Sequence, residues 1–461
     1  MTNDLRRKDD PAEIPLPGDR LLNNRFIRGF IKSRWYPGIF QWPTALVFMM
    51  IIYALLFGPA LAHGNFGTAL TWVLWWPVIP IIFILLGRFW CAICPFATLN
   101  DVVQKFTGHN RPVPQFLKKY GIWIIDAVFI LITWGDHVFG LVESPWNSGI
   151  LLLMIVTAVV AVGVLWARRS FCRYLCFLGG LSSNYSQAGV LALRGSPAKC
   201  SQCKVSACYK GTQTVPGCPM FEFPRTMTTN SQCNLCGYCV KSCPNESLTF
   251  KARIPTEELW SVSKPQFAAS FLAVVIMGIV FIQNITMLNV WQSILSELEN
   301  TLGTSSYYAT FTVSFLIAMS IPIILLGVAS SLAGRANHGS LVKNFTIFGY
   351  AIIPLDVAAH IAHNLFHLLA EGGSILITGA AFFGLEANGV SPALLDNMTI
   401  QILQYALIAL GVIGSLYTAY RLSARNFPGK RWPTLLPYGA LILFLGIINT
   451  ILFSLPMAMR M

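Results

Sequence analysis

Twelve cysteines carry the clearest chemical signal in this sequence, and eight of them lie between positions 200 and 243. Residues 233–244 read CNLCGYCVKSCP, which places Cys233, Cys236, Cys239 and Cys243 in a C-x2-C-x2-C-x3-C-P run. Thiolates at this spacing bind [4Fe–4S] clusters: three of them bind one cubane, and the fourth reaches across to a neighbouring one. The run therefore predicts one-electron redox chemistry and calls for a second cysteine set.

A second set precedes this run and supplies the expected partner. It also ends in Cys-Pro, but its spacers of four and nine residues replace the usual two and three. By the crossing rule, one cluster is bound by Cys233, Cys236, Cys239 and Cys218, and the other by Cys200, Cys203, Cys208 and Cys243. Paired C-x2-C groups also occur in zinc ribbons, which is the alternative interpretation. Eight cysteines with two Cys-Pro endings favour two [4Fe–4S] clusters.

The remaining four cysteines form two pairs, each directly after a long apolar stretch. They lie in GRFWCAICPF (87–96) and RRSFCRYLCFLGG (168–180), and each segment ends an apolar hairpin, which indicates an internal repeat. If the two repeats meet, their thiolates can bind a third cluster or another metal, or act as a reactive dithiol; otherwise they are unliganded structural residues. These four residues are Cys91, Cys94, Cys172 and Cys176.

The elements that position these cysteines are membrane helices. With 55% hydrophobic and 11% charged residues, the chain is too apolar for an ordinary soluble enzyme. Stretches of about 20 apolar residues cross the hydrocarbon of a bilayer. They predict nine spans, at 43–62, 67–87, 121–142, 148–167, 266–284, 309–333, 345–370, 400–420 and 434–456. We expect an all-α polytopic membrane protein with an inserted two-cluster ferredoxin-like domain, in contact with membrane lipid.

The distribution of charge predicts the orientation, because cytoplasmic loops collect Lys and Arg. If 1–40, 88–120, 168–265, 335–343 and 421–431 lie inside, that side holds 31 of the 32 basic residues and all twelve cysteines. Topology then explains the net charge of +13, so no nucleic-acid partner is expected. We predict a bacterial-type inner-membrane protein with a cytoplasmic N-terminus and ferredoxin domain and an external C-terminus. Disulfides are not expected in that compartment.

Four parts follow from this arrangement. Residues 1–40 form a cytoplasmic segment, and 41–167 form a four-helix transmembrane repeat with cysteine pairs at its inner helix ends. Residues 168–265 form the cytoplasmic domain for two [4Fe–4S] clusters. Residues 266–461 form a five-helix transmembrane domain.

Residues 30–255 resemble a family of membrane polyferredoxins. The family includes the quinol dehydrogenase subunit of periplasmic nitrate reductase, the regulatory iron–sulfur protein of nitrous oxide respiration and the cupric reductase of oxidase assembly. The resemblance covers RWYPGIFQWP (34–43), GRFWCAICPF, FCRYLCFLGG and the eight ferredoxin cysteines. The family pairs are C-x3-C-P, whereas the first pair here is C-x2-C-P and Phe177 replaces the second proline. The resemblance implies membrane electron transfer, or copper reduction as in the last relative.

The last domain contains a histidine cluster on one predicted helical face, formed by His360, His363 and His367, with Asp356 one turn earlier. Ionisable groups inside a membrane are costly, so a function is the default hypothesis. His63 and His137 end other spans at a similar predicted depth. Paired imidazoles from facing helices would bind haem b. The alternatives are another metal, a quinol or proton-transfer site in which Asp126 and Asp356 accept protons, or histidines that only hydrogen-bond within the bundle.

These residues predict an integral electron-transfer protein that links cytoplasmic iron–sulfur clusters to a haem b or quinol site near the outer face. Its partners would be quinol and other redox subunits or a periplasmic electron acceptor, as in a respiratory membrane oxidoreductase. The direction of electron flow does not follow, because cluster potentials span roughly −700 to +450 mV. The alternatives are a copper reductase or maturation factor, and a redox sensor or transporter.

Overall fold

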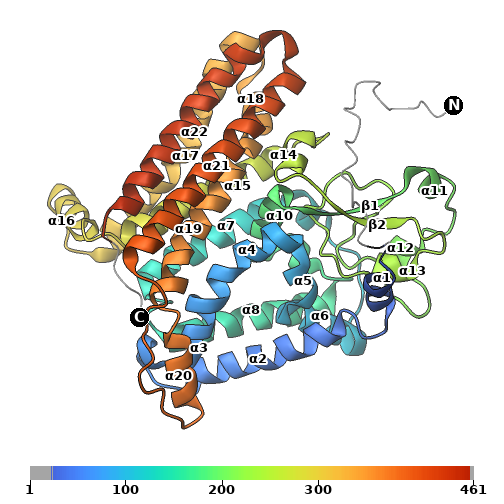
Figure 1. The fold of residues 1–461 in the computed structure, drawn as a ribbon, viewed down its shortest axis with the longest axis horizontal. Coiled ribbons are helices and arrows are strands. Elements are labelled where there is room, and N and C mark those ends of the chain that lie inside the picture. The colour runs from blue at the N-terminus through green and yellow to red at the C-terminus, as the bar shows by residue number, and fades with distance from the viewer. Residues whose placement is uncertain (1–21, 23, 457–461) are drawn as a thin grey trace.

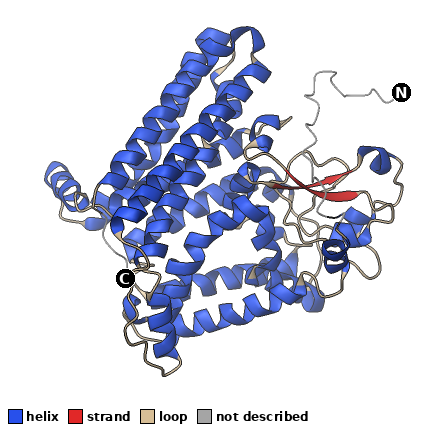
Figure 2. Ribbon diagram, in the orientation of Figure 1, coloured by secondary structure: helices blue, strands red, loops and turns tan. Residues whose placement is uncertain are grey.

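The computed structural model describes residues 22 and 24–456. Helices make up most of these residues, and the two strands lie together in one loop-rich unit beside the helices (Figures 1 and 2). Most of the N-terminal segment predicted at 1–40, and the predicted external end of the chain at 457–461, lie outside the described residues.

The N-terminal membrane part consists of two helical hairpins. Its helices are α1 (Arg25–Lys32), α2 (Gly38–Phe57), α3 (Phe66–Thr68), α4 (Trp76–Leu86), α5 (Trp90–Ile93), α6 (Pro95–Thr107), α7 (Gln115–Phe139) and α8 (Pro145–Leu165). A π-helical segment, Ala69–Trp75, joins α3 to α4. The first hairpin is α2 with the α3–α4 helix, and the second is α7 with α8, so the predicted repeat corresponds to two similar units.

The C-terminal membrane part is a bundle around one central helix. Its helices are α15 (Phe267–Thr286), α16 (Trp291–Leu302), α17 (Tyr307–Asn337), α18 (Leu341–Phe348), α19 (Ile353–Ala370), α20 (Ser374–Phe382), α21 (Asn397–Asn426) and α22 (Arg431–Ser454). The protein itself buries 78% of the most apolar window of α15, against 11% for α2. Helix α15 is therefore enclosed by other helices, whereas α2 presents most of its surface outwards.

Helices fall at all nine predicted spans. Eight helical segments among the described residues are long and apolar enough to cross a membrane, and a ninth results if α18 and α19 count as one span bent by 44°. The span predicted at 345–370 thus corresponds to two helices with a bend between them. Pro354 has no N–H to continue the helical ladder, and the Leu355 N–H donates to Ser415 Oγ at 3.0 Å instead, so the helix breaks there.

The loop-rich unit, whose cytoplasmic location stays a prediction, contains β1 (Leu191–Gly195) and β2 (Leu248–Ala252), an antiparallel pair with Leu191 opposite Ala252. Four short helices surround or follow this pair: α11 (Pro197–Ser201), α12 (Ala207–Lys210), α13 (Tyr238–Ser242) and α14 (Glu257–Ser261). Helix α9 (Ser170–Tyr174) precedes them and contacts α7 and α8. Within the range predicted for this domain, α10 (Phe177–Ala188) packs instead among the membrane helices, where Tyr185 contacts His360 of α19. The cluster-binding unit thus begins after α10.

Candidate iron–sulfur sites and the polar residues behind them

Four of the predicted ligands line one pocket in the loop-rich unit. Cys218, Cys233, Cys236 and Cys239 surround it together with apolar residues such as Leu193 and Leu235. Burial raises the pKa of Cys236 to about 12, and the backbone N–H of Tyr238 opposes that rise by hydrogen-bonding the sulfur. The N–H of Leu235 acts on Cys233 in the same way. Backbone N–H groups aimed at buried sulfurs suit thiolates, which are the ligand form that a cluster requires.

Local backbone geometry explains why a glycine lies between two of these ligands. Gly237 has a φ of +74°, and a Cβ atom there would lie 2.8 Å from both Ile31 Cγ2 and Tyr36 Cε1. Any other residue would be strained by the left-handed backbone conformation, and its Cβ atom would clash with Ile31 and Tyr36. Tyr36 closes this side of the pocket, and its hydroxyl donates to the Leu235 carbonyl at 2.7 Å.

The other four predicted ligands form a second group at the β-strand ends. Ser247 joins two of them, because its Oγ lies 3.4 Å from Cys200 Sγ and 3.3 Å from Cys243 Sγ. Burial raises the pKa of Cys208 to about 11, and the neighbouring thiols Cys243, Cys200 and Cys203 raise it further. The structure therefore brings together the two crossed sets of four that the sequence predicts, while their role as ligands stays a prediction.

The two groups lie side by side. Burial raises the pKa of Cys239 well above its usual range. The nearby thiols raise this pKa further, first those of its own group of four and then Cys208 of the second group. Among the described residues, no three His, Cys, Asp or Glu side chains converge as ligands of a single metal ion. A cubane binds each thiolate at a different iron, so its four ligands need not converge on one point. Two adjacent groups of four thiols match the ligand requirement of two [4Fe–4S] clusters.

The inner cysteine pairs occupy equivalent positions in the two repeats. Cys91 lies in α5 and Cys172 in α9, and the second member of each pair, Cys94 or Cys176, is the N-cap of the helix that follows. Burial raises the pKa of Cys172, and the thiols of Cys176 and Cys91 raise it further. The two repeats therefore bring four thiols together at one end of the hairpins. We call these four residues, Cys91, Cys94, Cys172 and Cys176, the inner quartet.

Each inner pair has a buried arginine three residues before its first cysteine. Arg88 is 1% exposed, and its Nη1 donates to the Ser231 carbonyl and to Gln232 Oε1, both at 2.7 Å. Its Nη2 lies 4.0 Å from Cys91 Sγ. Arg169 is 0% exposed, donates to the Cys91 carbonyl at 2.8 Å and pairs with Asp101. Neither arginine was predicted from the sequence, although both occupy the same position in RFWC and RSFC, three residues before the first cysteine.

The inner quartet adjoins the pocket group directly. Cys236 packs in one apolar cluster with Ala92 and Ile93, the residues between Cys91 and Cys94. Cys218 and Met220 pack in another cluster with Cys94, Cys172 and Cys176. The pocket group, Cys218, Cys233, Cys236 and Cys239, therefore lies between the inner quartet and the surface group of Cys200, Cys203, Cys208 and Cys243.

The histidines of α19 are buried and engaged with polar partners. His360 Nδ1 lies 2.9 Å from the Tyr185 hydroxyl, and its ring lies 5.8 Å from that of Trp76. His363 Nδ1 lies 2.7 Å from Asn284 Oδ1. His367 contacts Glu371 Oε1 and Met287 Sδ, each at 3.2 Å. Asp356, one turn before His360, is fully buried, as is Asp126 in α7, and neither carboxylate has a hydrogen-bond partner among the described residues.

The two other predicted histidines differ from these three. His63 is exposed in a short 3-10 turn, Ala62–Gly64. In His137, Nδ1 lies 2.9 Å from the Thr133 carbonyl and Nε2 lies 3.1 Å from Thr286 Oγ1, so both ring nitrogens are engaged. Thr286 ends α15, next to Met287, so His137 and His367 lie at the same end of that helix. The engaged ring of His137 makes it a poor haem ligand in this arrangement.

Tyr185 is the residue of this region that the sequence analysis missed. It is 0% exposed and lies on α10, one turn after Ser182, whose Oγ is 3.5 Å from Cys91 Sγ. The helix thus connects the inner quartet to His360. The available signal was the polar sequence LSSNYSQA at 181–188, which follows the second cysteine pair. Polar residues directly after a membrane span indicate either an exposed segment or buried polar contacts, and here the contacts are buried.

Comparison with known proteins supports an iron–sulfur function. A family described as a 4Fe-4S binding domain matches residues 68–114 and 148–192, segments that contain the two inner cysteine pairs. The chain is 26% identical over 246 residues to an Escherichia coli protein named "Putative electron transport protein YccM". The aligned part covers 47% of this chain and 66% of that protein, just under two thirds of its length. No solved structure matches the chain.

These matches support a membrane polyferredoxin-like family, a complement of two [4Fe–4S] clusters and a role in iron–sulfur electron transfer. They cover the inner pairs, and the eight cysteines from Cys200 onwards lie beyond the matched domain segments.

Proposed function

We propose that this protein conducts electrons between the cytoplasmic surface and the interior of the membrane through three successive cysteine sites. The observation that carries the proposal is the unbroken packing from the surface group to the pocket group and on to the inner quartet. A [4Fe–4S] cluster, when bound, supplies a one-electron site with little rearrangement. The chain's own residues exclude water from the sulfurs, donate N–H groups to them and hold neighbouring sites in contact.

The inner quartet is proposed as a third cluster site. Arg88 supports this assignment, because no carboxylate lies within ion-pair distance of its buried guanidinium among the described residues. A buried charge without a counter-charge is strongly unfavourable. Neutral thiols would leave Arg88 in that condition, whereas thiolates bound to iron provide negative charge beside it. A reactive dithiol or unliganded cysteines explain the arginine less well.

We propose that the outer end of the path is a quinol or haem b site beside α19. The buried polar side chains that follow the inner quartet support this position: Tyr185, His360, His363, Asn284 and His367. Buried imidazole and carboxyl groups can accept the protons that leave a quinol on oxidation. The redox partner on that side would be a periplasmic acceptor or another membrane subunit, and the cysteines would face the cytoplasm.

Iron analysis of anaerobically purified protein tests this proposal. Three cubanes correspond to about twelve iron and twelve sulfide per chain, each with a paramagnetic signal on reduction. Cys172→Ser should remove the signal of the inner site and leave the other two, whereas Cys233→Ser should remove the pocket signal. If wild-type protein and Cys172→Ser both contain about eight iron atoms per chain, the inner quartet holds no cluster. Protein without iron and with stoichiometric zinc would overturn the whole proposal.

A second candidate is copper reduction, which one contact favours. The imidazole of His367 lies 3.2 Å from the Met287 thioether, and soft sulfur with imidazole is a donor set that copper accepts. Copper analysis after dialysis, with His367→Ala as the comparison, tests this. Copper lost in the variant would favour it, and equal copper in both proteins would exclude this site.

A further inference from the structure

The most exposed part of the cysteine path is surrounded by positive charge. Cys203 accepts backbone N–H groups from Val205 and Ser206, and it is only partly buried. Val205 beside it is 61% exposed. Five exposed residues lie on the segments that adjoin Cys203, and we call them the entry face: Lys199, Lys204, Val205, Lys210 and Arg225. Arg225 donates to the Ser201 carbonyl at 2.6 Å.

Few acids are available to balance these cations, because the nearby Glu246 pairs with Arg28 and Lys32. Between residues 197 and 227 the only acid is Glu222, and its carboxylate pairs with Arg173 at 2.8 Å. Each of the four cations is exposed. The apolar Val205 lies among them, which gives the patch the apolar centre and charged rim of a protein–protein contact.

The entry face also lies away from the membrane helices. Figure 1 shows α11, which carries Lys199, at the edge of the loop-rich unit farthest from α17, α21 and α22. The cations that follow the positive-inside rule most directly are those at helix ends, such as Arg335 at the end of α17 and Lys343 near the start of α18. Lys199 and Lys204 are in neither position, so topology alone does not explain them.

We propose that the entry face is the docking site for a small acidic one-electron carrier of the ferredoxin type, which exchanges electrons with the site that includes Cys203. This inference rests on the proposed electron-transfer function and adds a partner to it. The step is balanced, because the carrier loses one electron and the receiving site gains one; no bond forms or breaks and no proton moves. Opposite charge raises the encounter rate of such pairs by roughly 10–1000-fold at low salt.

A kinetic comparison of two matched charge-reversal variants tests the proposal. Lys199→Glu with Lys204→Glu reverses two charges on the entry face, and Arg335→Glu with Lys343→Glu reverses two exposed charges elsewhere. The oxidised protein in lipid nanodiscs is mixed with a reduced acidic [2Fe–2S] ferredoxin, and cluster reduction is followed by stopped flow. The entry-face variant should react at least about tenfold more slowly than wild type, and the control should react at the wild-type rate.

Two further measurements separate electrostatic docking from other effects. High salt should abolish the difference, because the Debye length falls to about 3 Å at 1 M. Reduced methyl viologen, a small cationic donor, should reduce the entry-face variant at least as fast as wild type, since its charge is opposite to that of the ferredoxin. Equal slowing with both donors would indicate a damaged cluster and overturn the docking assignment.

Two controls vary the charge of the nanodisc lipids and measure the cluster content of each protein. The slowing should be the same in neutral and in anionic nanodiscs, and slowing in anionic discs alone would assign the entry face to lipid contact. If all proteins contain clusters that viologen reduces, and ferredoxin reduces both variants at the wild-type rate, the docking proposal fails while the proposed function stands. If wild-type protein contains no cluster, the proposed function itself fails.

Discussion

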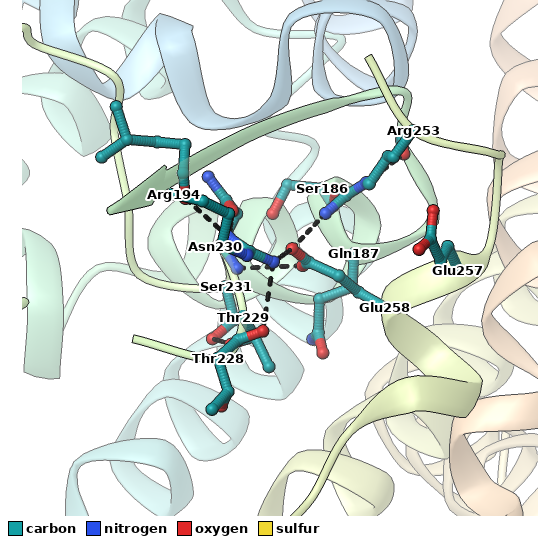
Figure 3. Close-up of polar contacts among 12 residues, drawn as sticks. Ser186, Gln187, Arg194, Thr228, Thr229, Asn230, Ser231, Arg253, Glu257 and Glu258 are labelled. Atoms are coloured by element: carbon teal, nitrogen blue, oxygen red, sulfur yellow. Dashed lines mark hydrogen bonds and ion pairs between the residues drawn. The ribbon is translucent and has the colours of Figure 1, made fainter. Parts of the chain in front are cut away.

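Replacement of Glu258 by glutamine should loosen the loop that leads to Cys233. Glu258 is 2% exposed and pairs with both Arg194 and Arg253, and its Oε2 accepts the Asn230 N–H at 2.9 Å (Figure 3). The Asn230 carbonyl in turn accepts the N–H of Cys233 at 2.9 Å. One carboxylate thus joins α14, the two strands and the loop that carries a predicted cluster ligand.

The expected magnitude follows from the burial of the arginines. The Arg253 side chain is 5% exposed, and burial lowers its pKa while Glu258 opposes that shift. Removal of one partner of a buried pair costs about 3–5 kcal/mol. Arg194 is 24% exposed and can turn to water, and glutamine can still accept hydrogen bonds, so we expect the lower limit of about 3 kcal/mol. If loop opening controls cluster loss, this corresponds to roughly a hundredfold faster loss.

Bleaching of cluster absorbance in air or chelator measures that rate. Glu257→Gln is the matched control, because Glu257 is the adjacent acid on α14 and its carboxylate accepts the Ile254 N–H at 3.2 Å. Among the described residues it forms no ion pair with Arg194 or Arg253 and raises the pKa of Arg253 less than Glu258 does. The control should bleach at the wild-type rate. Equal bleaching of the Glu258→Gln variant and the control would refute the view that this network secures the cluster loop.

Three other substitutions test separate parts of the structure. Tyr185→Phe removes the buried hydrogen bond to His360 and should lower the free energy of unfolding by about 1–3 kcal/mol and slow oxidation by an outer acceptor, at unchanged iron content; unchanged oxidation would remove Tyr185 from the path. Gly237→Ala should deplete the pocket cluster, because of the clash with Ile31 and Tyr36, and wild-type iron content would contradict this. Val205→Cys should react with an impermeant thiol reagent in inside-out vesicles and not in intact cells, and the reverse would invert the predicted orientation.

The sequence predicted best those features that depend on short-range patterns. Spacing and the crossing rule together divided eight cysteines into the two sets of four that the structure brings together. This was possible because a cluster constrains the spacing of the cysteines that bind it. Hydrophobic length located nine helical regions within a few residues, because the thickness of a bilayer sets that length.

Features that depend on contacts between distant segments were not predictable in this way. Tyr185 and His360 are separated by 175 residues and meet only because α10 folds back among the membrane helices. The bend before α19 depends on Ser415, which receives the N–H freed beside Pro354. The five histidines were grouped by depth, yet the structure leaves His63 exposed and engages both nitrogens of His137. Depth is one coordinate of three, and it does not determine which side chains face each other.

The cations near the cysteine sites differ in burial: those near the surface group are exposed, and those near the inner quartet are buried. At the surface group, water and backbone N–H groups can stabilise the charge of Cys203, and the nearby lysines remain free on the surface. At the inner quartet water is excluded, and two buried guanidinium groups are present instead. Arg169 has Asp101 as its counter-ion, so it contributes little net charge, whereas Arg88 has only neutral oxygens and the sulfur of Cys91. Arg88 also donates to the Ser231 carbonyl, two residues before Cys233, so this buried cation contacts both the inner quartet and the loop that carries the pocket cysteines.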